Sequence, residues 1–243
     1  MKKTVLFIAL ALAVPSAALA QTAELPPCID ATLAYYVENF QNGCILEDKV
    51  FSGFSGNSSG TPGANLLANE DINVFVDPTA LNPGLAFQGA WNALNGQTND
   101  TLIQFTVTVM EGGNPIEDAS LGIQGSGTIG VAGVSVAETL CLGGLFGPGC
   151  SSGNVANLLV ADLPGDNDIL FDHTTFDPVM SVDVTKDINL FASGTGEVNF
   201  ATLSLVTQNF SETPVPEPAT LSLLGTGLVM LGGAVRRRLK SKA

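Results

Sequence analysis

The sequence predicts a mainly β protein: a single antiparallel, β-sandwich-like domain with a short N-terminal helix, followed by one C-terminal transmembrane helix. Three observations lead to this prediction. Short segments alternate apolar and polar residues between clusters of turn-forming residues, as antiparallel sheets with two different faces do. Glycine, serine, threonine and asparagine are frequent, which favours extracellular β structure over an α/β enzyme fold. Residues 219–235 carry no charge and come directly before a cluster of arginines.

The charges of the 243-residue chain, −14 in formal total, are unevenly distributed. Between residues 21 and 213 there are 22 acidic residues and only two basic ones, Lys49 and Lys186. A body this acidic repels nucleic acid and anionic lipid, so nucleic-acid binding is excluded. This length is sufficient for one hydrophobic core, and we expect one acidic, β-rich domain over residues 21–213.

The first 20 residues have the composition of a cleaved export signal. Two lysines at positions 2 and 3 precede ten apolar residues at 5–14, and small residues follow. Ten residues span only ~15 Å as a helix, about half of the ~30 Å hydrocarbon core, which argues against a retained anchor. We therefore expect signal peptidase to remove residues 1–20, recognising Ala18 and Ala20 before Gln21.

A helix is predicted near the start of the exported body. Apolar residues recur there at helical spacing, and we expect a helix over 31–40 with Asp30 as its N-cap and Gly43 as its stop signal. The ends of such a helix lie ~15 Å apart, whereas disulfide partners need Cα atoms within about 7 Å. A disulfide between Cys28 and Cys44 is therefore feasible only if the helix is short or the chain folds back over it.

Export makes disulfides chemically possible, and the four cysteines allow three pairings. We favour Cys28–Cys44 and Cys141–Cys150 because both close short loops, and the second loop, CLGGLFGPGC, is rich in glycine and proline. Zinc binding is the rival interpretation. Zinc binding is disfavoured because the only histidine, His173, is distant in sequence from the cysteines and no Cys-x-x-Cys motif occurs.

The remainder of the body has the alternation of β-strands. A hairpin is predicted from residues 187–192, a Ser-Gly-Thr-Gly turn, and residues 197–207. Residues 52–65, rich in serine, glycine and asparagine, are predicted to form a loop. Further strands, each with one apolar face, are expected over 71–77, 101–110 and 180–185.

The C-terminal end combines three features in a fixed order. Pro-Glu-Pro at 216–218 precedes the uncharged segment 219–235, and three arginines follow it. As a helix this segment is ~26 Å long, just short of the ~30 Å hydrocarbon core, so it can span a thin or locally thinned membrane. The positive-inside rule keeps the arginines in the cytoplasm and leaves the exported body outside. A simple tail anchor explains the helix and the arginines but not the Pro-Glu-Pro.

This arrangement resembles the PEP-CTERM sorting signal, found in proteins of Gram-negative bacteria that are processed by an exosortase, a membrane cysteine protease-transpeptidase. The resemblance covers about a tenth of the chain and assigns 214–243 to the sorting signal. It implies a substrate of exosortase that is held transiently in the inner membrane and then reaches the cell surface or extracellular matrix. It further implies that the recognition motif is Pro216, Glu217 and Pro218, and that the retention cluster is Arg236, Arg237 and Arg238.

Four aspartates in the segment DLPGDNDILFDHTTFD form a candidate calcium site, because calcium requires hard oxygen donors in a loop. The spacing departs from the EF-hand pattern, since Leu170 stands where the third ligand should be. A solvated acidic turn is the alternative. The candidate ligands are Asp162, Asp166, Asp168 and Asp172.

Catalysis is not expected. A Ser-His-Asp arrangement would need His173 as its base, and no Gly-x-Ser-x-Gly elbow is present. One tryptophan and two tyrosines are few for a sugar cleft that needs stacking platforms. We therefore expect that the protein is not an enzyme. Apart from the candidate calcium ion, we expect it to bind no cofactor. Two functions remain: a structural or adhesive protein of exopolysaccharide or a biofilm matrix, and a carbohydrate- or calcium-binding extracellular module.

Overall fold

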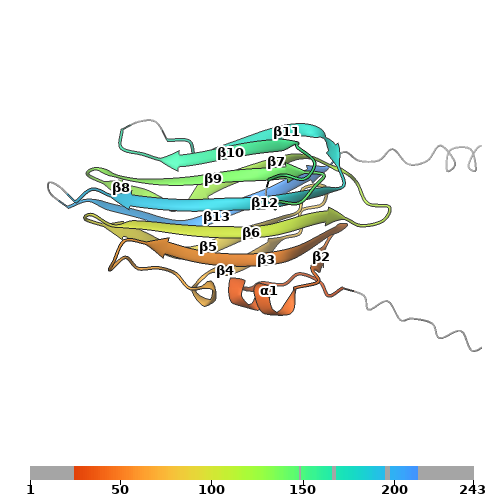
Figure 1. Ribbon diagram of the computed structural model, residues 1–243, viewed down its shortest axis with the longest axis horizontal. Coiled ribbons are helices and arrows are strands. Elements are labelled where there is room, and N and C mark those ends of the chain that lie inside the picture. The colour runs from red at the N-terminus through yellow and green to blue at the C-terminus, as the bar shows by residue number, and fades with distance from the viewer. Residues whose placement is uncertain (1–24, 148, 166–167, 195–197, 213–243) are drawn as a thin grey trace, which may run out of the picture.

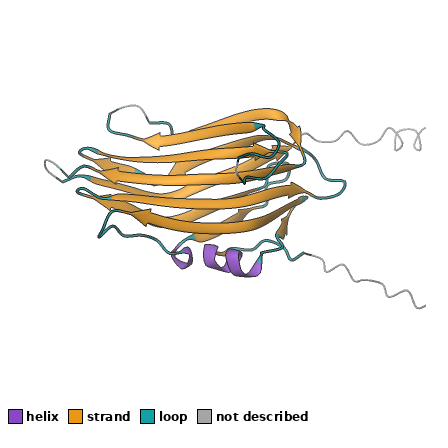
Figure 2. Cartoon of the chain, in the orientation of Figure 1, coloured by secondary structure: helices purple, strands orange, loops and turns teal. Residues whose placement is uncertain are grey.

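The computed structural model describes residues 25–147, 149–165, 168–194 and 198–212. These residues form two antiparallel sheets that face each other, with a short helix along one edge (Figures 1 and 2). One sheet has six strands in the order β10-β9-β12-β6-β3-β2. The other has seven strands in the order β1-β4-β5-β13-β7-β11, with β8 pairing beside β13. The predicted mainly β, sandwich-like fold with a short N-terminal helix is confirmed.

Strands that follow one another along the chain often lie in different sheets. The six-stranded sheet consists of β2 (Cys44–Leu46), β3 (Lys49–Gly60), β6 (Thr98–Val109), β9 (Ala132–Leu142), β10 (Val155–Asp162) and β12 (Ser181–Ala192). The seven-stranded sheet consists of β1 (Ala31–Thr32), β4 (Asn73–Asp77), β5 (Gly84–Leu94), β7 (Ile116–Gln124), β8 (Gly127–Ile129), β11 (Phe171–Val179) and β13 (Phe200–Glu212). The helical elements are α1 (Leu33–Asn39) and a single 3-10 turn, η1 (Asn69–Asp71).

Side chains that alternate inward from both sheets form the core. Phe105 of β6 lies in an aromatic cluster, with its ring centroid 5.6 Å from that of Phe54 and 5.9 Å from that of Phe87. Trp91 is fully buried, and its indole Nε1 donates a hydrogen bond to the hydroxyl of Thr101 at 3.2 Å. The only tryptophan of the chain therefore belongs to the core.

The helix α1 is shorter than predicted and has a different N-cap. Its cap is Thr32, whose hydroxyl accepts a hydrogen bond from the backbone N–H of Tyr35 at 3.2 Å. The predicted cap, Asp30, instead accepts from the backbone N–H of Val76 at 2.9 Å. The reason is that β1 pairs with β4, which holds residues 31 and 32 in an extended conformation.

The short helix lets the chain return to Cys28. The last helical residue is Asn39, and the backbone N–H of Gly43 donates to the carbonyl of Phe40 at 2.9 Å. Gly43 has a φ of +105°, a conformation that glycine adopts without strain. Cys28 and Cys44 then come within 4.8 Å between Cα atoms and form a disulfide. This is the geometry that the sequence required for such a pair.

The prediction of a loop over 52–65 is wrong for its first part. β3 extends to Gly60 and pairs with β6 along its length, with a bulge between Ser52 and Ser55. A strand needs only backbone hydrogen-bond partners, and β6 supplies them whatever the side chains are. Glycine is required at position 60, since a Cβ there would lie 2.4 Å from the carbonyl oxygen of Thr98.

The predicted hairpin of 187–192 with 197–207 is also wrong. Residues 181–192 form one continuous strand, β12, between β6 and β9. The chain then passes to β13, which lies in the opposite sheet between β5 and β7. Alternation predicts which face of a strand is buried, but it does not identify the neighbouring strand.

Both ends of the described chain lie at the same end of the sandwich (Figure 1). The last described residue, Glu212, is held by Lys49, whose Nζ donates to Glu212 Oε1 at 2.5 Å. Within 25–212, apart from the short gaps, no helix is long and apolar enough to cross a membrane. The predicted export signal at 1–20 and the predicted span at 219–235 lie outside the described residues.

Candidate functional site

Four strands of the six-stranded sheet, β3, β6, β9 and β12, present mostly small polar side chains outward, and we call this surface the polar face. The edge strand β10 differs, because Val155 and Leu159 are exposed on it. Successive strand residues point to opposite sides, so each apolar residue that enters the core leaves a polar neighbour outside. Its members are the outward-pointing residues of four strands: Ser52, Ser55, Asn57, Ser59, Asp100, Leu102, Gln104, Thr106, Thr108, Ser135, Ala137, Thr139, Ser181, Asp183, Thr185, Asp187 and Asn189.

Hydrogen bonds between neighbouring strands order the polar face. Gln104 of β6 donates from Nε2 to the hydroxyl of Thr185 at 3.1 Å, and Ser55 reaches Gln104 Oε1 at 3.4 Å. One row further along, the hydroxyl of Thr106 donates to Asp183 Oδ1 at 2.6 Å. The face thus offers hydroxyl, amide and carboxylate groups on a sheet that holds them in fixed positions.

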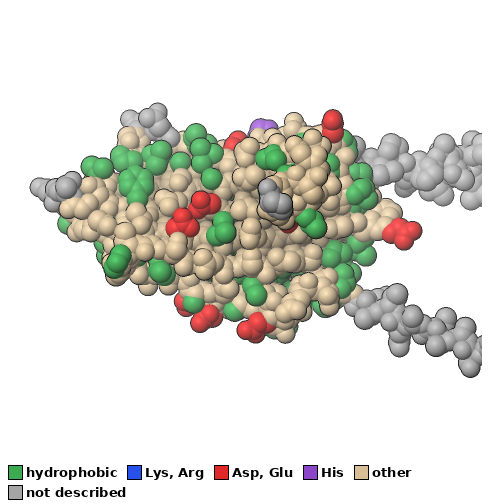
Figure 3. All heavy atoms as spheres, viewed as in Figure 1, with side chains coloured by type: hydrophobic (Ala, Val, Ile, Leu, Met, Phe, Trp, Pro, Cys, Tyr) green, Lys and Arg blue, Asp and Glu red, His purple; other side chains and the backbone are tan. Residues whose placement is uncertain are grey.

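The surface of the described residues carries no lysine or arginine side chain. The two lysines of the body, Lys49 and Lys186, are both fully buried, and no arginine occurs between residues 25 and 212. Figure 3, which views the polar face, shows acidic groups and no basic ones. The charge of this surface therefore repels polyanions such as nucleic acid, and the absence of nucleic-acid binding stays a prediction.

Two carboxylates on the polar face interact unfavourably. Burial raises the pKa of Asp187, and the nearby charge of Asp100 raises that pKa further. Asp187 Oδ1 is buried and has no hydrogen-bond partner within the described part of the chain. Ionised Asp187 therefore destabilises the fold at neutral pH.

Replacing Asp187 with Asn should raise the free energy of unfolding at pH 7 by less than about 1 kcal/mol, because the site is partly exposed to solvent. A raised pKa in the folded state means that the penalty is present above that pKa and vanishes as the pH falls below the ordinary value of 3.8. Urea unfolding at several pH values measures this difference. Asp177→Asn, at an exposed position of β11, is the control. An Asp187→Asn variant that is less stable than the parent at pH 7 would contradict the conclusion that ionised Asp187 destabilises the fold.

Both lysines are buried against carboxylates. At the end of the sandwich where the chain leaves, Lys49 Nζ donates to Asp48 Oδ1 and Glu212 Oε1, both at 2.5 Å, and to the carbonyl of Asn114 at 2.9 Å. In the centre of the core, Lys186 forms an ion pair with Glu138. Burial raises the pKa of Glu138 and lowers that of Lys186.

Sequence reasoning missed these buried lysines, although a signal was present. In VDVTKDINL, Lys186 shares the phase of Val182, Val184 and Ile188, so a period of two places it in the core. Glu138 likewise shares the phase of its apolar neighbours on β9. A charged residue in the apolar phase of a strand therefore indicates a buried partner of opposite charge.

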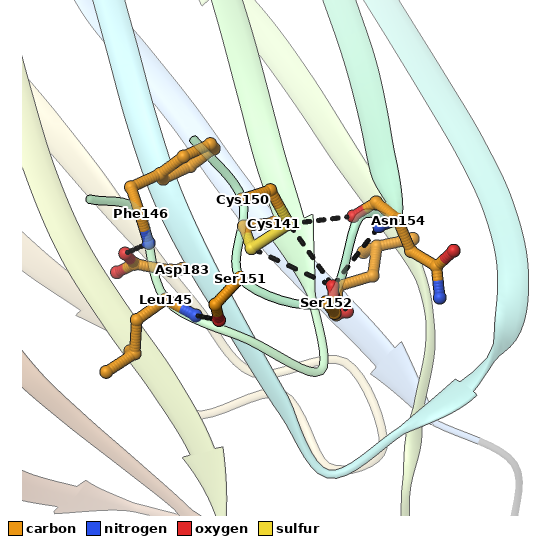
Figure 4. Close-up of a disulfide and its surroundings, with 9 residues drawn as sticks. Cys141, Leu145, Phe146, Cys150, Ser151, Ser152, Asn154 and Asp183 are labelled. Carbon is orange, nitrogen blue, oxygen red and sulfur yellow. Dashed lines mark hydrogen bonds between the residues drawn. A yellow bond between two sulfur atoms is a disulfide. The ribbon is translucent and has the colours of Figure 1, made fainter. Parts of the chain in front are cut away.

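The second disulfide fixes a loop against the polar face (Figure 4). Cys141 and Cys150 are joined, with 5.3 Å between their Cα atoms. The backbone N–H of Phe146 donates to Asp183 Oδ2 at 2.7 Å, and that of Leu145 donates to the hydroxyl of Ser151 at 2.9 Å. The loop forms one side of a solvent-open pocket of about 440 Å³, lined by Leu145, Phe146 and Cys150.

Both disulfides join the pairs that the sequence favoured, and the described residues contain no free cysteine. We expect the exported protein, denatured without reductant, to leave maleimide unreacted. Reduction first should give four labelled cysteines per chain, as the sequence contains four. The readout is intact-mass spectrometry after labelling. Labelling of two or more cysteines without reduction would contradict the pairing.

The calcium prediction gains no geometric support from the described residues. Asp162 Oδ1 accepts from the hydroxyl of Thr128 at 3.3 Å, while Asp172 accepts from the backbone N–H groups of Leu159 and His173, each at 2.9 Å. In the part of the chain that the structure describes, no three His, Cys, Asp or Glu side chains come together as a metal site. Asp168 is exposed, and Asp166 lies outside the described residues, so calcium binding stays a prediction.

Stacking platforms for sugar rings are sparse. Trp91 and Tyr36 are fully buried. The exposed aromatic side chains are Tyr35 on α1, Phe75 on β4 and Phe171 on β11, and none of them belongs to the polar face. Recognition at the polar face would therefore depend on hydrogen bonds.

Beyond Glu212 the chain continues into the Pro-Glu-Pro segment, and a family model for the PEP-CTERM protein-sorting motif matches residues 214–238. The chain carries a PEP-CTERM sorting motif. The predicted recognition residues 216–218 and the cluster 236–238 fall within the match and lie outside the described residues. A PEP-CTERM motif implies an exported protein with an exosortase as its processing partner.

Comparisons of the rest of the PEP-CTERM protein add little. No curated protein matches the sequence. A solved structure described as TmCBM61 in complex with beta-1,4-galactotriose shares 12% sequence identity, with a TM-score of 0.27, over 65% of this chain and 88% of that one. A TM-score this low carries no argument about the fold or the ligand of this chain.

Proposed function

We propose that this chain is a non-catalytic surface or matrix protein, delivered by exosortase processing and structural or adhesive within exopolysaccharide. The observation that carries the proposal is the PEP-CTERM motif directly after the last core strand. The surface of the described residues, which carries acidic and no basic side chains, and the two disulfides support an exported body. The absence of enzyme activity is part of the proposal: His173, the only imidazole, lies on the exposed strand β11 and stacks with Phe171 at 6.2 Å between ring centroids.

The distance between the fold and the motif limits how processing can occur. Glu212 is fixed by Lys49, and Pro216 follows it by four residues, which reach at most ~14 Å when fully extended. An exosortase that recognises residues 216–218 therefore works close to the folded body. We infer that the end of the sandwich containing Lys49 and Glu212 faces the membrane before cleavage.

A second candidate is a carbohydrate-binding module, favoured by the ordered hydroxyl and amide groups of the polar face. These groups can donate to and accept from sugar hydroxyls, and the face carries no positive charge that would select anionic glycans. The low number of exposed aromatic residues favours the structural role over this one.

The proposal is tested by localising an epitope-tagged chain in cells with and without the exosortase. We expect tagged material at the surface or in the matrix only when the exosortase is present, and retained precursor in the membrane when it is absent. Equal release from both strains would contradict the sorting role. A glycan array with and without calcium then separates the two candidates, since binding that Gln104→Ala and Thr185→Ala abolish would favour the carbohydrate-binding module.

A further inference from the structure

The centre of the core contains three polar side chains in contact. Lys186 of β12, Glu138 of β9 and Gln208 of β13 are each at most 1% exposed. Lys186 and Glu138 are directly paired in the six-stranded sheet, and Gln208 reaches them from the middle strand of the opposite sheet. The same-phase neighbours on each strand are apolar and buried: Val184, Ile188, Val136, Leu140, Val206 and Phe210. The three groups are therefore shielded from water.

The contacts place an amine beside an amide carbonyl. Lys186 Nζ donates to Gln208 Oε1 at 2.8 Å and also to Glu138 Oε2. Two atoms of this cluster, Gln208 Nε2 and Glu138 Oε1, are buried and form no well-aligned hydrogen bond. The amide of Gln208 is nevertheless close enough to lower the pKa of Glu138. Unpaired polar atoms in a dry core are costly and require an explanation.

We propose that Lys186 and Gln208 form an intramolecular amide bond after folding, with Glu138 transferring the protons. In the first step Glu138 takes a proton from Lys186, which leaves a neutral amine and a neutral carboxylic acid. The lone pair of Lys186 Nζ then attacks Cδ of Gln208, the Nζ–Cδ bond forms, and the carbonyl electrons move to Oε1.

The second step breaks the Cδ–Nε2 bond. Glu138 gives its proton to Nε2 and receives one from Nζ, the carbonyl re-forms, and ammonia leaves. Glu138 ends in its carboxylic acid form, no electrons are gained or lost, and the balance is amine plus amide giving a substituted amide plus ammonia. Gln208 Nε2, which is buried and lies near the Glu138 carboxyl group, is the leaving nitrogen.

The surroundings favour this reaction in two ways. Burial lowers the pKa of Lys186 and raises that of Glu138, and both shifts favour the neutral pair that the attack requires. Fixed contact within one molecule replaces a bimolecular encounter, which gives effective concentrations of ~10⁵ M or more when the groups are well oriented. The product would join β12 to β13 and so link the two sheets covalently.

Lys49 provides an internal control. It contacts two carboxylates, Asp48 and Glu212, and the side chain of Asp48 is 28% exposed. It also donates to the backbone carbonyl of Asn114, whose side-chain amide donates to Glu212 Oε2 at 3.1 Å. Because Lys49 has two carboxylates as side-chain partners and one of them reaches solvent, we expect it to stay a free lysine.

The test is tryptic digestion and mass spectrometry of the full exported chain, denatured and reduced. Lys49 and Lys186 are the only trypsin sites between residues 21 and 213. We expect cleavage after Lys49, no cleavage after Lys186, and a fragment beginning at Val50 whose mass is below that of its reduced sequence by one ammonia. This fragment excludes Gln21, which can lose ammonia by cyclising at the N-terminus. Cleavage after both lysines with an unchanged mass would overturn the proposal. A loss of one water instead would place the bond at Glu138 and overturn the assignment to Gln208.

A variant then tests the role of Glu138. Glu138→Gln keeps the side-chain volume but removes the proton-transferring acid, so we expect cleavage after Lys186 and the full sequence mass. Asp187→Asn, on the polar face of the same strand as Lys186, should keep the bond. A fully linked Glu138→Gln variant would overturn the proton-transfer role. The wild-type measurement decides the existence of the bond even if the variant does not fold.

Discussion

Relative to the unlinked chain, in which Lys186 and Glu138 are still an ion pair, replacing Lys186 with Met should lower the free energy of unfolding by about 3–5 kcal/mol, because Glu138 would then be a buried carboxylate without its cationic partner. A loss of this size corresponds to a fall in Tm of about 6–20 °C for a domain of this length. Burial already raises the pKa of Glu138, so the loss should shrink as the pH falls and the carboxyl becomes protonated. Calorimetry at neutral and acidic pH measures both effects.

Two further variants separate the charge effect from loss of packing. Lys186→Met combined with Glu138→Leu leaves no unpaired charge in the core and should recover the larger part of the loss. Asn189→Ala, at a polar-face position of the same strand, should change the free energy of unfolding by less than about 0.5 kcal/mol. If the double variant were less stable than Lys186→Met alone, the unpaired carboxylate of Glu138 would not be the cause of the stability loss in Lys186→Met.

Replacing Arg236, Arg237 and Arg238 together with Ser should abolish normal processing and leave the body folded. A charged residue at the bilayer centre costs ~2.5–3.5 kcal/mol on insertion scales, so three arginines strongly oppose passage of the chain end. The uncharged segment is short and contains four glycines, each costing about 1 kcal/mol of helix propensity relative to Ala. Without the arginines, residues 216–218 are no longer held at a fixed depth for the exosortase.

The expected product of this triple variant is unprocessed precursor or secreted full-length chain, detected by immunoblotting of the membrane and the medium. The far-UV spectrum and the thermal midpoint of the body should match the parent. Lys240→Ser with Lys242→Ser removes two positive charges beyond the cluster and should be processed normally. Cleavage of the triple variant at the parental rate would mean that the arginines do not retain the tail.

The strands that were predicted correctly are those in which apolar side chains alternate against polar ones. Ile103, Phe105 and Val107 are buried as the period of two requires. The two disulfides could be predicted from loop length, although the helix predicted over 31–40 argued against Cys28–Cys44 and the observed helix is shorter. Residues 52–60 could not be recognised as a strand, because the pairing comes from the backbone of β6 rather than from their own side chains.

The polar face and the buried lysines show the limit of sequence reasoning more clearly. Alternation places Gln104 and Thr185 outside, but only the register of β6 with β12 places them in contact. Lys186 lies in the apolar phase of β12, yet its partner Gln208 belongs to the other sheet. Contacts between sheets depend on the order of the strands, and the local pattern does not contain that order.

Removal of the C-terminal segment is the central claim, and mass spectrometry of the protein recovered from the cell surface tests it most directly. The PEP-CTERM motif matches residues 214–238, and we expect the exosortase to cleave near Pro216–Pro218, before the uncharged segment. The account predicts that peptides of the body are abundant in cells with the exosortase, that no peptide from 221–235 is found there, and that those peptides reappear when the exosortase is deleted. Recovery of an intact C-terminus from surface material of exosortase-containing cells would contradict the account.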